Sequence, residues 1–239
     1  MIHKKVKHLY SGKVKSLFTT EDPNLLITEF RDDTTAFDGV KHEMLQDKGR
    51  TNNKISAFFM EKLAQAGVPT HHVKLLSDTE ELVKKLNMIR LECVVRIIAA
   101  GSLCKRYGIT QGKKLEKPLF ELFVKSDSLH DPLIGEKTAL ALDYVNEKQL
   151  KEMEQLSLKI NSVLSKLLAD ADMTLVDAKF EFGVDIDGHL MLADEISPDS
   201  CRIWDVKSKN PLDKDRFRKD MGGVIEAYKE IAKRLGIDI

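Results

Sequence analysis

The chain has 239 residues, with 38 basic (Lys and Arg) and 38 acidic (Asp and Glu) side chains, so its formal net charge is zero. Nucleic-acid binders usually carry a basic excess, because counterion release supplies much of their affinity for phosphates; the balance therefore argues against a nucleic-acid partner. No stretch approaches the roughly 18 uncharged apolar residues that suggest a membrane span. With 42% hydrophobic residues, the chain can form one large domain or two closely packed lobes.

The cysteines and the N-terminus indicate a cytoplasmic protein. Cys93, Cys104 and Cys201 are odd in number and lack the C-x-x-C spacing, which argues against a disulfide framework or a structural zinc site. The basic N-terminus is not followed by the apolar segment of a secretory signal. Three reduced thiols are therefore expected.

Short strands and one helix are predicted for the first hundred residues. Residues 6–10 and 14–20 flank a glycine-containing turn and predict a hairpin, and residues 24–30 predict the next strand. Apolar residues recur at helical spacing over residues 52–66, and Gly67 ends this helix. Further strands are predicted over residues 73–76, 82–86 and 91–98.

The second part of the chain is mixed. An apolar stripe at steps of three and four predicts a helix over residues 149–168. Residues 174–185 and 189–192 predict two strands joined by a turn at Asp187-Gly188. A last helix is predicted over residues 214–235.

Together these elements indicate an α+β fold in two lobes. The predicted N-terminal lobe, residues 1–90, is rich in strands. The predicted C-terminal lobe, residues 91–239, contains both helices and strands.

The sharpest local pattern is the sequence LVDAKFEFGV at residues 175–184. Side chains alternate between the faces of a strand, so Asp177, Lys179 and Glu181 share one face and apolar residues occupy the other. Carboxylates can hold a hard cation such as Mg²⁺, and the lysine can meet phosphate or carboxylate oxygens. The alternative is an amphipathic surface strand whose charges pair with one another, and this stretch taken alone favours that alternative.

The next predicted strand ends in the sequence ADEISPDSCR at residues 193–202. If it pairs with the previous strand, Asp194 falls toward the same end as Asp177 and Lys179, and carboxylates from neighbouring strands suit Mg²⁺. Arg202 offers bidentate recognition of a carboxylate or phosphate. A helix N-cap role for the serine or aspartate of the turn is the alternative, and the two are compatible.

Three weaker features accompany these strands. The turn at residues 11–13, followed by Lys15, can bring backbone and cations close to phosphates, but it is not a Walker loop and alone more often marks a plain hairpin. Arg96, inside a buried-looking strand, needs an anionic partner, which is either a structural acid or a ligand. Gly101 and Ser102 end that strand and could offer backbone N–H groups and a hydroxyl to a phosphate.

Other polar segments have solvated alternatives. Residues 31–39 and 130–132 are loops that could line a site or form exposed turns. His71 and His72 lack a partner at metal-ligand spacing, which favours surface histidines. Residues 214–219, at the start of the last helix, indicate a solvated face whose cations could reach over a cleft.

Taken together and in order, these stretches resemble the phosphoribosylaminoimidazole-succinocarboxamide synthase (SAICAR synthetase) family nearly end to end. The specific signatures are D-x-K-x-E-x-G at residues 177–183 and D-E-x-S-P-D at residues 194–199. The other matching stretches are YSGKVK (10–15), FDG (37–39), ECVVR (92–96), AGS (100–102), HDP (130–132) and DRFR (215–218). Ile97 and Ser200-Cys201 depart from the residues common in the family, which affects the detailed shape of the pocket but leaves the chemistry in place.

The resemblance implies an ATP-dependent ligase of purine (IMP) biosynthesis. Its substrates are ATP, L-aspartate and carboxyaminoimidazole ribonucleotide (CAIR), its products are SAICAR, ADP and phosphate, and Mg²⁺ is its metal. The resemblance also implies a homodimer and an N-terminal lobe similar to the nucleotide-holding lobe of protein kinases.

Carried over residue by residue, the resemblance implies roles for individual side chains. The ATP-binding set is Gly12, Lys13, Val14, Lys15, Leu17, Leu26, Met88, Glu181 and Asp194, in which Leu17, Leu26 and Met88 flank the adenine. Glu181 and Asp194 hold Mg²⁺. The ribonucleotide-binding set is Arg96, Ser102, Asp177, Lys179, Arg202, Lys214 and Arg218. Asp177 and Lys179 are the catalytic candidates.

Two rival functions stay open at the level of the sequence. A phosphotransferase would use the same ATP lobe to phosphorylate a metabolite hydroxyl, although the sequence has no H-R-D or D-F-G motif of a protein kinase. A nucleotide sensor or a binding module for a partner protein would bind ATP without turnover. The concentration of charged residues in two adjacent strands disfavours the sensor.

Overall fold

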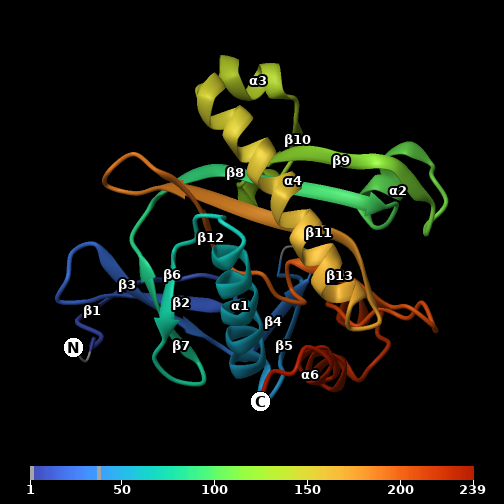
Figure 1. Cartoon of the computed structure of the whole chain (residues 1–239), viewed down its shortest axis with the longest axis horizontal. Coiled ribbons are helices and arrows are strands. Elements are labelled where there is room, and N and C mark those ends of the chain that lie inside the picture. The colour runs from blue at the N-terminus through green and yellow to red at the C-terminus, as the bar shows by residue number, and fades with distance from the viewer. Residues whose placement is uncertain (1–2, 37–38) are drawn as a thin grey trace.

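The computed structural model describes residues 3–36 and 39–239, and it has the predicted α+β class. Two antiparallel sheets form its framework (Figure 1). The motif residues Phe37 and Asp38 lie outside the described residues.

The first sheet takes its five strands from the first part of the chain and has the order β1-β2-β3-β7-β6. Its strands are β1 (Lys7–Ser11), β2 (Lys15–Thr19), β3 (Leu25–Phe30), β6 (His72–Leu75) and β7 (Glu80–Lys84). The pairing of β1 with β2 confirms the predicted hairpin around Gly12. A separate hairpin consists of β4 (Asp33–Ala36) and β5 (Lys41–Met44).

Helix α1 (Lys48–Gln65) packs against β3, β6 and β7 of this sheet. Ile55, Phe59 and Leu63 recur every four residues along it and are buried, as the helical spacing predicts. Gly67 ends the helix in the left-handed conformation (φ 75°), which glycine adopts at low cost.

The second sheet has the order β10-β9-β8-β11-β12, and β13 also pairs with β11. Its strands are β8 (Asn87–Ile98), β9 (Lys114–Val124), β10 (Leu133–Ile134), β11 (Met173–Val184), β12 (Leu190–Ala193) and β13 (Cys201–Asp205). The sequence patterns predict β8, β11 and β12 but not β9, whose first half is largely exposed and contains Pro118. Strand β11 lies in the middle and joins β8 on one side to β12 and β13 on the other.

Helix α4 (Glu147–Ala169) lies across β8, β9 and β11 (Figure 1). The predicted apolar stripe is the buried face, represented by Met153, Ile160 and Leu164. Asn146 caps its N-terminus in a capping box with Gln149. One hydrophobic core runs from α1 through β8 and β11 to α4.

The prediction of one helix over residues 214–235 is wrong. The segment forms two helices, α5 (Asp215–Arg218) and α6 (Val224–Arg234). Gly222 and Gly223 separate them with φ angles of 68° and 60°, a backbone conformation that no α-helix accommodates. The remaining helices are α2 (Ser102–Tyr107), α3 (Glu136–Ala141) and a 3₁₀ turn at Asp127–Leu129.

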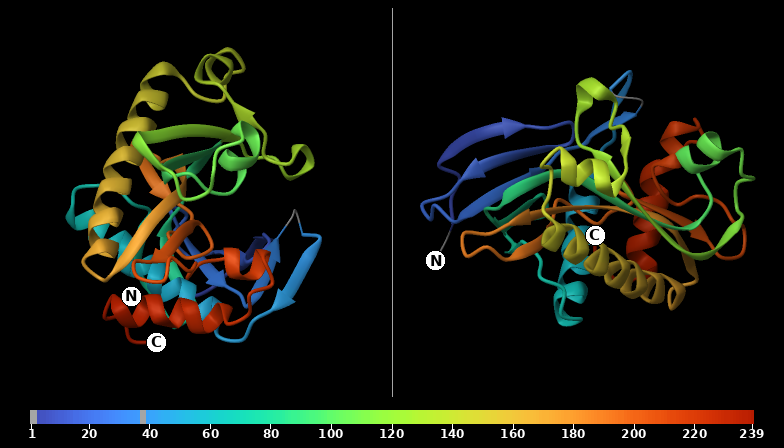
Figure 2. Two further views of the ribbon diagram at one scale, coloured as in Figure 1. Left: turned by 90° about the vertical axis from the view of Figure 1, so that its right-hand side faces the viewer. Right: turned by 90° about the horizontal axis from the view of Figure 1, so that it is seen from above.

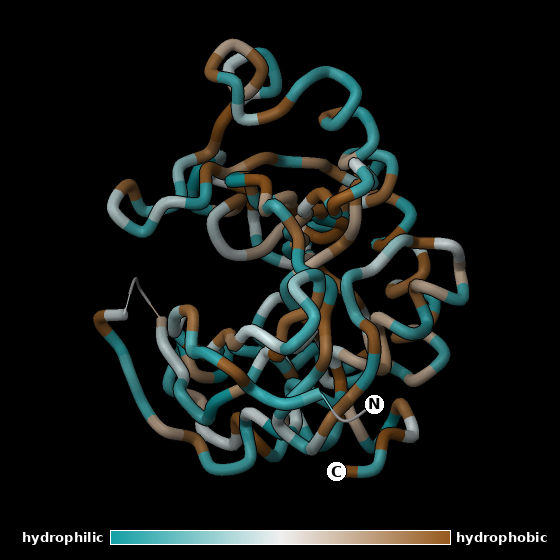
Figure 3. The backbone as a smooth tube through the Cα atoms, turned by 90° about the vertical axis from the view of Figure 1, so that its left-hand side faces the viewer, coloured by the Kyte–Doolittle hydropathy of each residue, from teal (hydrophilic) through white to brown (hydrophobic). Residues whose placement is uncertain are grey.

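The two sheets take their strands from either side of residues 85–86, and the boundary predicted at residue 90 falls within β8. Figure 2 shows the helices around the two sheets, and Figure 3 shows short hydrophobic and hydrophilic stretches alternating along the chain. The division into two lobes stays a prediction. None of the helices in the described part of the chain is long and apolar enough to cross a membrane.

Candidate active site

Strand β11 separates its charged side chains from its apolar ones as predicted. Ala178, Phe180 and Phe182 are at most 1% exposed and belong to the core. The charged residues between them form ion pairs on the opposite face. The alternation therefore places a polar cluster on one face of the strand and packed core side chains on the other.

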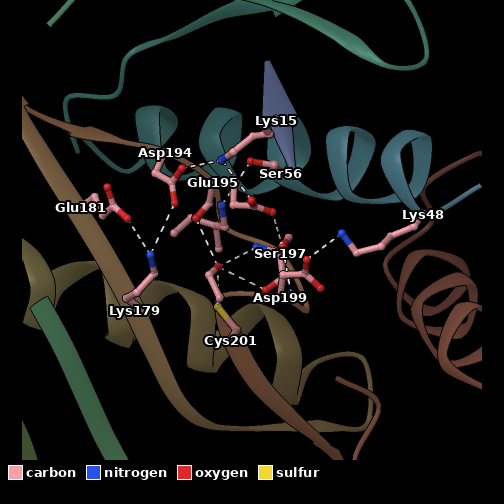
Figure 4. A network of polar contacts seen from close by, with 12 residues as sticks. Lys15, Lys48, Ser56, Lys179, Glu181, Asp194, Glu195, Ser197, Asp199 and Cys201 are labelled. Atoms are coloured by element: carbon pink, nitrogen blue, oxygen red, sulfur yellow. Dashed lines mark hydrogen bonds and ion pairs between the residues drawn. The ribbon is translucent and has the colours of Figure 1, made fainter. Parts of the chain in front are cut away.

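Lys179 is the centre of this cluster (Figure 4). Its ammonium nitrogen lies 2.6 Å from Glu181, 3.0 Å from Glu92 and 3.6 Å from Asp194. Burial alone would lower the pKa of Lys179, but these carboxylates outweigh it and raise the pKa well above the ordinary value. Lys179 is therefore a permanent cation held among three carboxylates.

Lys15 of β2 connects the first sheet to the same cluster (Figure 4). Its ammonium group contacts Asp194 and lies 3.0 Å from Glu195. Burial would raise the pKa of Asp194, but Lys15 and Lys179 outweigh it and lower the pKa below its usual value. Asp194 follows β12 with φ 61°, a left-handed conformation that aspartate tolerates better than most residues. The site thus includes a carboxylate that leaves the strand from a left-handed backbone.

A cleft of about 390 Å³ lies over this cluster. One wall is the glycine turn between β1 and β2, and the other contains Lys125, Asp127 and Asp131. Lys13 of the turn bridges the two walls, with its nitrogen 2.8 Å from Asp127. Lys125 forms an ion pair with Glu181.

A second charged cluster surrounds Arg96, which is only 3% exposed. Its guanidinium donates to Glu121 at 2.6 Å, to Asp177 at 2.9 Å and to the hydroxyl of Ser102 at 3.1 Å. Arg202 also donates to Asp177, at 2.9 Å. The anionic partners of Arg96 in the described structure are therefore structural acids, one of the two alternatives that its buried position leaves open.

Arg202 continues this cluster toward the C-terminal segment. It donates to Asp215 at 3.1 Å, and Arg218 donates to the other oxygen of Asp215 at 2.7 Å. Gly101 (φ 56°) lies directly against Arg202, because an added Cβ would stand 2.5 Å from Nη2. The backbone thus requires the glycine, and a side chain at this position would displace the guanidinium beside it.

A third cluster is buried beneath the cleft. Lys48, 1% exposed, lies 2.8 Å from Asp199, and the hydroxyl of Tyr228 donates to the same carboxylate at 2.7 Å. Lys214 lines the cleft with its nitrogen 3.7 Å from Asp199. Burial lowers the pKa of Lys214. Asp199 therefore joins three elements, the start of α1, α6 and the segment before α5.

A model of the SAICAR synthetase family matches residues 8–235. The chain belongs to this family. It is 59% identical over 235 residues to a phosphoribosylaminoimidazole-succinocarboxamide synthase of Coxiella burnetii (strain RSA 493 / Nine Mile phase I), with 98% of each chain covered.

Solved SAICAR synthetase structures share the fold. The enzyme from Ehrlichia chaffeensis superimposes with a TM-score of 0.95 at 42% identity, covering 98% of this chain and all of that one. A SAICAR synthetase in complex with ADP gives 0.93 at 44% identity, covering 96% of this chain and 97% of that one. The predicted family and fold class are confirmed.

The SAICAR synthetase signature residues divide between the cleft and its surroundings. The predicted residues that line the cleft are Gly12, Lys13, Val14, Lys15, Leu17, Lys179, Glu181, Asp194 and Lys214. The second cluster contains Arg96, Ser102, Asp177, Arg202 and, through Asp215, Arg218. The predicted adenine contacts Leu26, which is buried in the first sheet, and Met88, which is exposed at the start of β8, do not line the cleft. The individual roles of all these residues stay predictions.

Sequence reasoning missed several members of the site. Lys125 follows the unpredicted strand β9, so its position at a strand end was not apparent. Lys48 carries no local signal, since a lysine at a helix start is usually exposed. The prediction of surface histidines is wrong: His71 is 7% exposed and the side chain of His72 is also buried, because residues 69–71 run beside β12.

Proposed function

We propose that this chain joins L-aspartate to the carboxylate of CAIR at the expense of ATP, giving SAICAR, ADP and phosphate. The observation that carries the proposal is the convergence of the family signatures on one cleft. Lys15, at the start of β2 just after the glycine turn, contacts Asp194, which is 179 residues away in the sequence. Membership of the SAICAR synthetase family over residues 8–235, and a similar structure in complex with ADP, support the same activity.

The proposed reaction has two steps. A carboxylate is a poor acylating agent because its leaving group would be oxide. Transfer of the γ-phosphoryl group of ATP to a CAIR carboxylate oxygen gives an acyl phosphate and ADP. The aspartate nitrogen then attacks the acyl carbon, phosphate leaves, and the nitrogen loses a proton to become the amide. The protein chiefly positions the groups and balances their charge.

The glycine turn suits the phosphates of ATP. The Gly12 N–H donates to the Lys15 carbonyl at 2.8 Å, so it is used within the turn. The absence of a side chain at Gly12, rather than its N–H group, therefore permits close approach of a phosphate. Lys13 and Lys15 supply the positive charge, and Leu17, two residues after Lys15 on β2, offers an apolar contact to the adenine.

Glu181 and Asp194 fit a Mg²⁺ site. Both line the cleft and both lie close to the ammonium group of Lys179, and Mg²⁺ takes one or two carboxylates together with phosphate oxygens and water. When bound, the ion would neutralise charge on the transferred phosphoryl group. Lys179 would bridge the two carboxylates, keep them in place and face the CAIR carboxylate.

The cluster around Arg202 suits the ribonucleotide. Arg96 already donates to two carboxylates and to Ser102, so we assign it to holding Asp177 and Ser102 in place. Arg202 is less buried and lies against Gly101, where no side chain blocks its guanidinium. Arg202, with Ser102, is therefore the better candidate for direct contact with the ribonucleotide phosphate.

ADP release by the purified protein tests the proposal, with Mg-ATP, CAIR and L-aspartate supplied together and then omitted one at a time. The proposal expects release that requires all three, with SAICAR identified by mass. Release without aspartate would favour the phosphotransferase. ATP binding without release under any combination would favour the nucleotide sensor.

The predicted homodimer and cytoplasmic location rest on the family resemblance and on the sequence. Sedimentation velocity tests the homodimer, for which the derived molecular mass should be twice that of one chain. Fractionation of cells that produce the protein tests its location.

A further inference from the structure

The conformation of Asp194 sets the direction of its carboxylate. A φ of 61° is uncommon for residues with a side chain, although aspartate tolerates it better than most, and six aspartates of the described residues have a positive φ. In Asp194 this conformation accompanies a carboxylate that contacts Lys15 and faces Lys179. The direction of a proposed metal ligand thus depends on one of several backbone conformations open to aspartate.

Residues 69–71 hold the end of β12 from the side. The Leu192 N–H donates to the Pro69 carbonyl at 2.9 Å, and the His71 N–H donates to the Leu192 carbonyl at 2.8 Å. This short pairing places the imidazole of His71 two residues further along, beside the backbone of Asp194. Nε2 of His71 lies 3.2 Å from the Asp194 carbonyl oxygen.

The contact fixes which ring nitrogen carries the hydrogen. A carbonyl oxygen can only accept, so Nε2 must be the donor. A neutral imidazole has one N–H group, and the geometry therefore selects the Nε2–H tautomer.

We propose that His71 is a positioning residue for Asp194. Its Nε2–H group holds the Asp194 carbonyl, keeps that residue in the left-handed conformation and so aims its carboxylate into the cleft. The inference rests on the proposed function, in which Asp194 is a Mg²⁺ ligand. Groups that orient a metal ligand in this way contribute to metal affinity although they never touch the ion.

The next residue provides a matched control. The side chain of His72 is also buried, but its Nδ1 lies 2.9 Å from Glu81, away from Asp194. A change at His72 therefore disturbs a buried histidine of the same segment without removing the contact to Asp194. It separates loss of stability from loss of positioning.

The experiment compares His71→Ala, His71→Asn, His71→Gln and His72→Gln. The amide nitrogen of glutamine can occupy the position of Nε2. The side chain of asparagine is one methylene shorter, so its amide nitrogen reaches only the position of Nδ1. We expect His71→Ala and His71→Asn to raise the Mg²⁺ concentration for half-maximal rate by about tenfold and to weaken Mg-ADP binding in calorimetry similarly, while His71→Gln stays within about threefold of the unchanged protein. His72→Gln should lower the melting temperature and leave the Mg²⁺ dependence unchanged.

The ¹⁵N spectrum of the histidine rings gives a readout that does not depend on activity or on the folding of a variant. The unchanged protein should show the neutral Nε2–H tautomer at His71 near neutral pH. An Nδ1–H tautomer overturns the inference, and so does a loss in His71→Gln equal to that in His71→Ala, or normal Mg²⁺ dependence in both. If the unchanged protein makes no SAICAR, the proposed function fails instead, while the tautomer and the Mg-ADP affinities still decide the role of His71.

Discussion

Replacing Lys48 with methionine tests the buried charge cluster beneath the cleft. Methionine keeps much of the length and apolar character of the lysine stem but removes its charge. Lys48 is 1% exposed, and its partner Asp199 lies 2.8 Å away with a side chain 6% exposed. The substitution therefore leaves a carboxylate inside the protein without its main cation.

The magnitude follows from what remains around Asp199. Breaking a buried ion pair by removing one partner costs about 3–5 kcal/mol, since the other charge stays desolvated. Asp199 keeps the hydroxyl of Tyr228 at 2.7 Å and has the ammonium group of Lys214 at 3.7 Å. We therefore expect the lower end of the range, a loss of about 3 kcal/mol in the free energy of unfolding. For a chain of this length the melting temperature should fall by roughly 6–12 °C.

The assay is urea unfolding at neutral pH, followed by far-ultraviolet circular dichroism. Lys229→Met is the matched control, because Lys229 lies 2.7 Å from Asp47 but has a side chain 44% exposed. This surface pair should contribute less than about 1 kcal/mol. In the double variant with Asp199→Asn, loss of the buried carboxylate should recover about half of the cost of Lys48→Met.

Two results would refute this reasoning. One is a loss in Lys48→Met no larger than in Lys229→Met, which would mean that burial does not strengthen the Lys48 pair. The other is strict additivity of Lys48→Met and Asp199→Asn, which would mean that the two charges do not interact.

Three further predictions concern the cleft and the cluster beside it. Gly101→Ala should raise the KM for CAIR by about tenfold with the KM for ATP nearly unchanged, because the added Cβ would lie 2.5 Å from Arg202; equal effects on both constants in steady-state kinetics would contradict this. Glu181→Gln removes a carboxylate that Lys179 contacts at 2.6 Å, and it should raise the Mg²⁺ requirement by at least about tenfold; an unchanged Mg²⁺ titration would exclude that role. Burial would raise the pKa of Asp215, but Arg202 and Arg218 outweigh it and lower the pKa from 3.8 to about 2, so Asp215→Asn should cost about 1–2 kcal/mol at neutral pH. Since a lowered carboxyl pKa stabilises the fold above the ordinary pKa, this difference should shrink as the pH falls from 4 toward 2, and urea unfolding at pH 7 and pH 3 measures it.

Strong periodicity made much of the fold predictable. The stripe of α4 and the alternation of β11 each mark one apolar face, so local sequence was enough to assign them. Strand β9 escaped prediction because only its second half is buried. The break between α5 and α6 had a visible signal in Gly222-Gly223, which the helical pattern on either side outweighed.

The site was predictable where its residues lie on one element or on two strands joined by a short turn, as Lys179 and Asp194 do. Alternation along β11 places Lys179 and Glu181 on one face whatever surrounds the strand. The contacts of Lys48 with Asp199 and of His71 with the end of β12 join segments far apart in the chain, and no local spacing encodes them. Family resemblance supplied candidate roles, but buried ion pairs such as Lys48 with Asp199, which support the cleft residues from below, became visible only in three dimensions.

The central position of β11 determines where this protein can accept added sequence. Its charged and apolar faces are defined by register against β8, β12 and β13, so one inserted residue near Lys179 would turn every later side chain to the wrong face. The turn that follows is open to solvent instead: Ile186 is 81% exposed, and Gly188 has open space around it, although its φ of 86° requires that this residue stay glycine. A fluorescent reporter or affinity tag inserted into this turn would therefore leave the register of β11 unchanged, although the turn is only a few residues from the carboxylate of Glu181, whose position depends on that register.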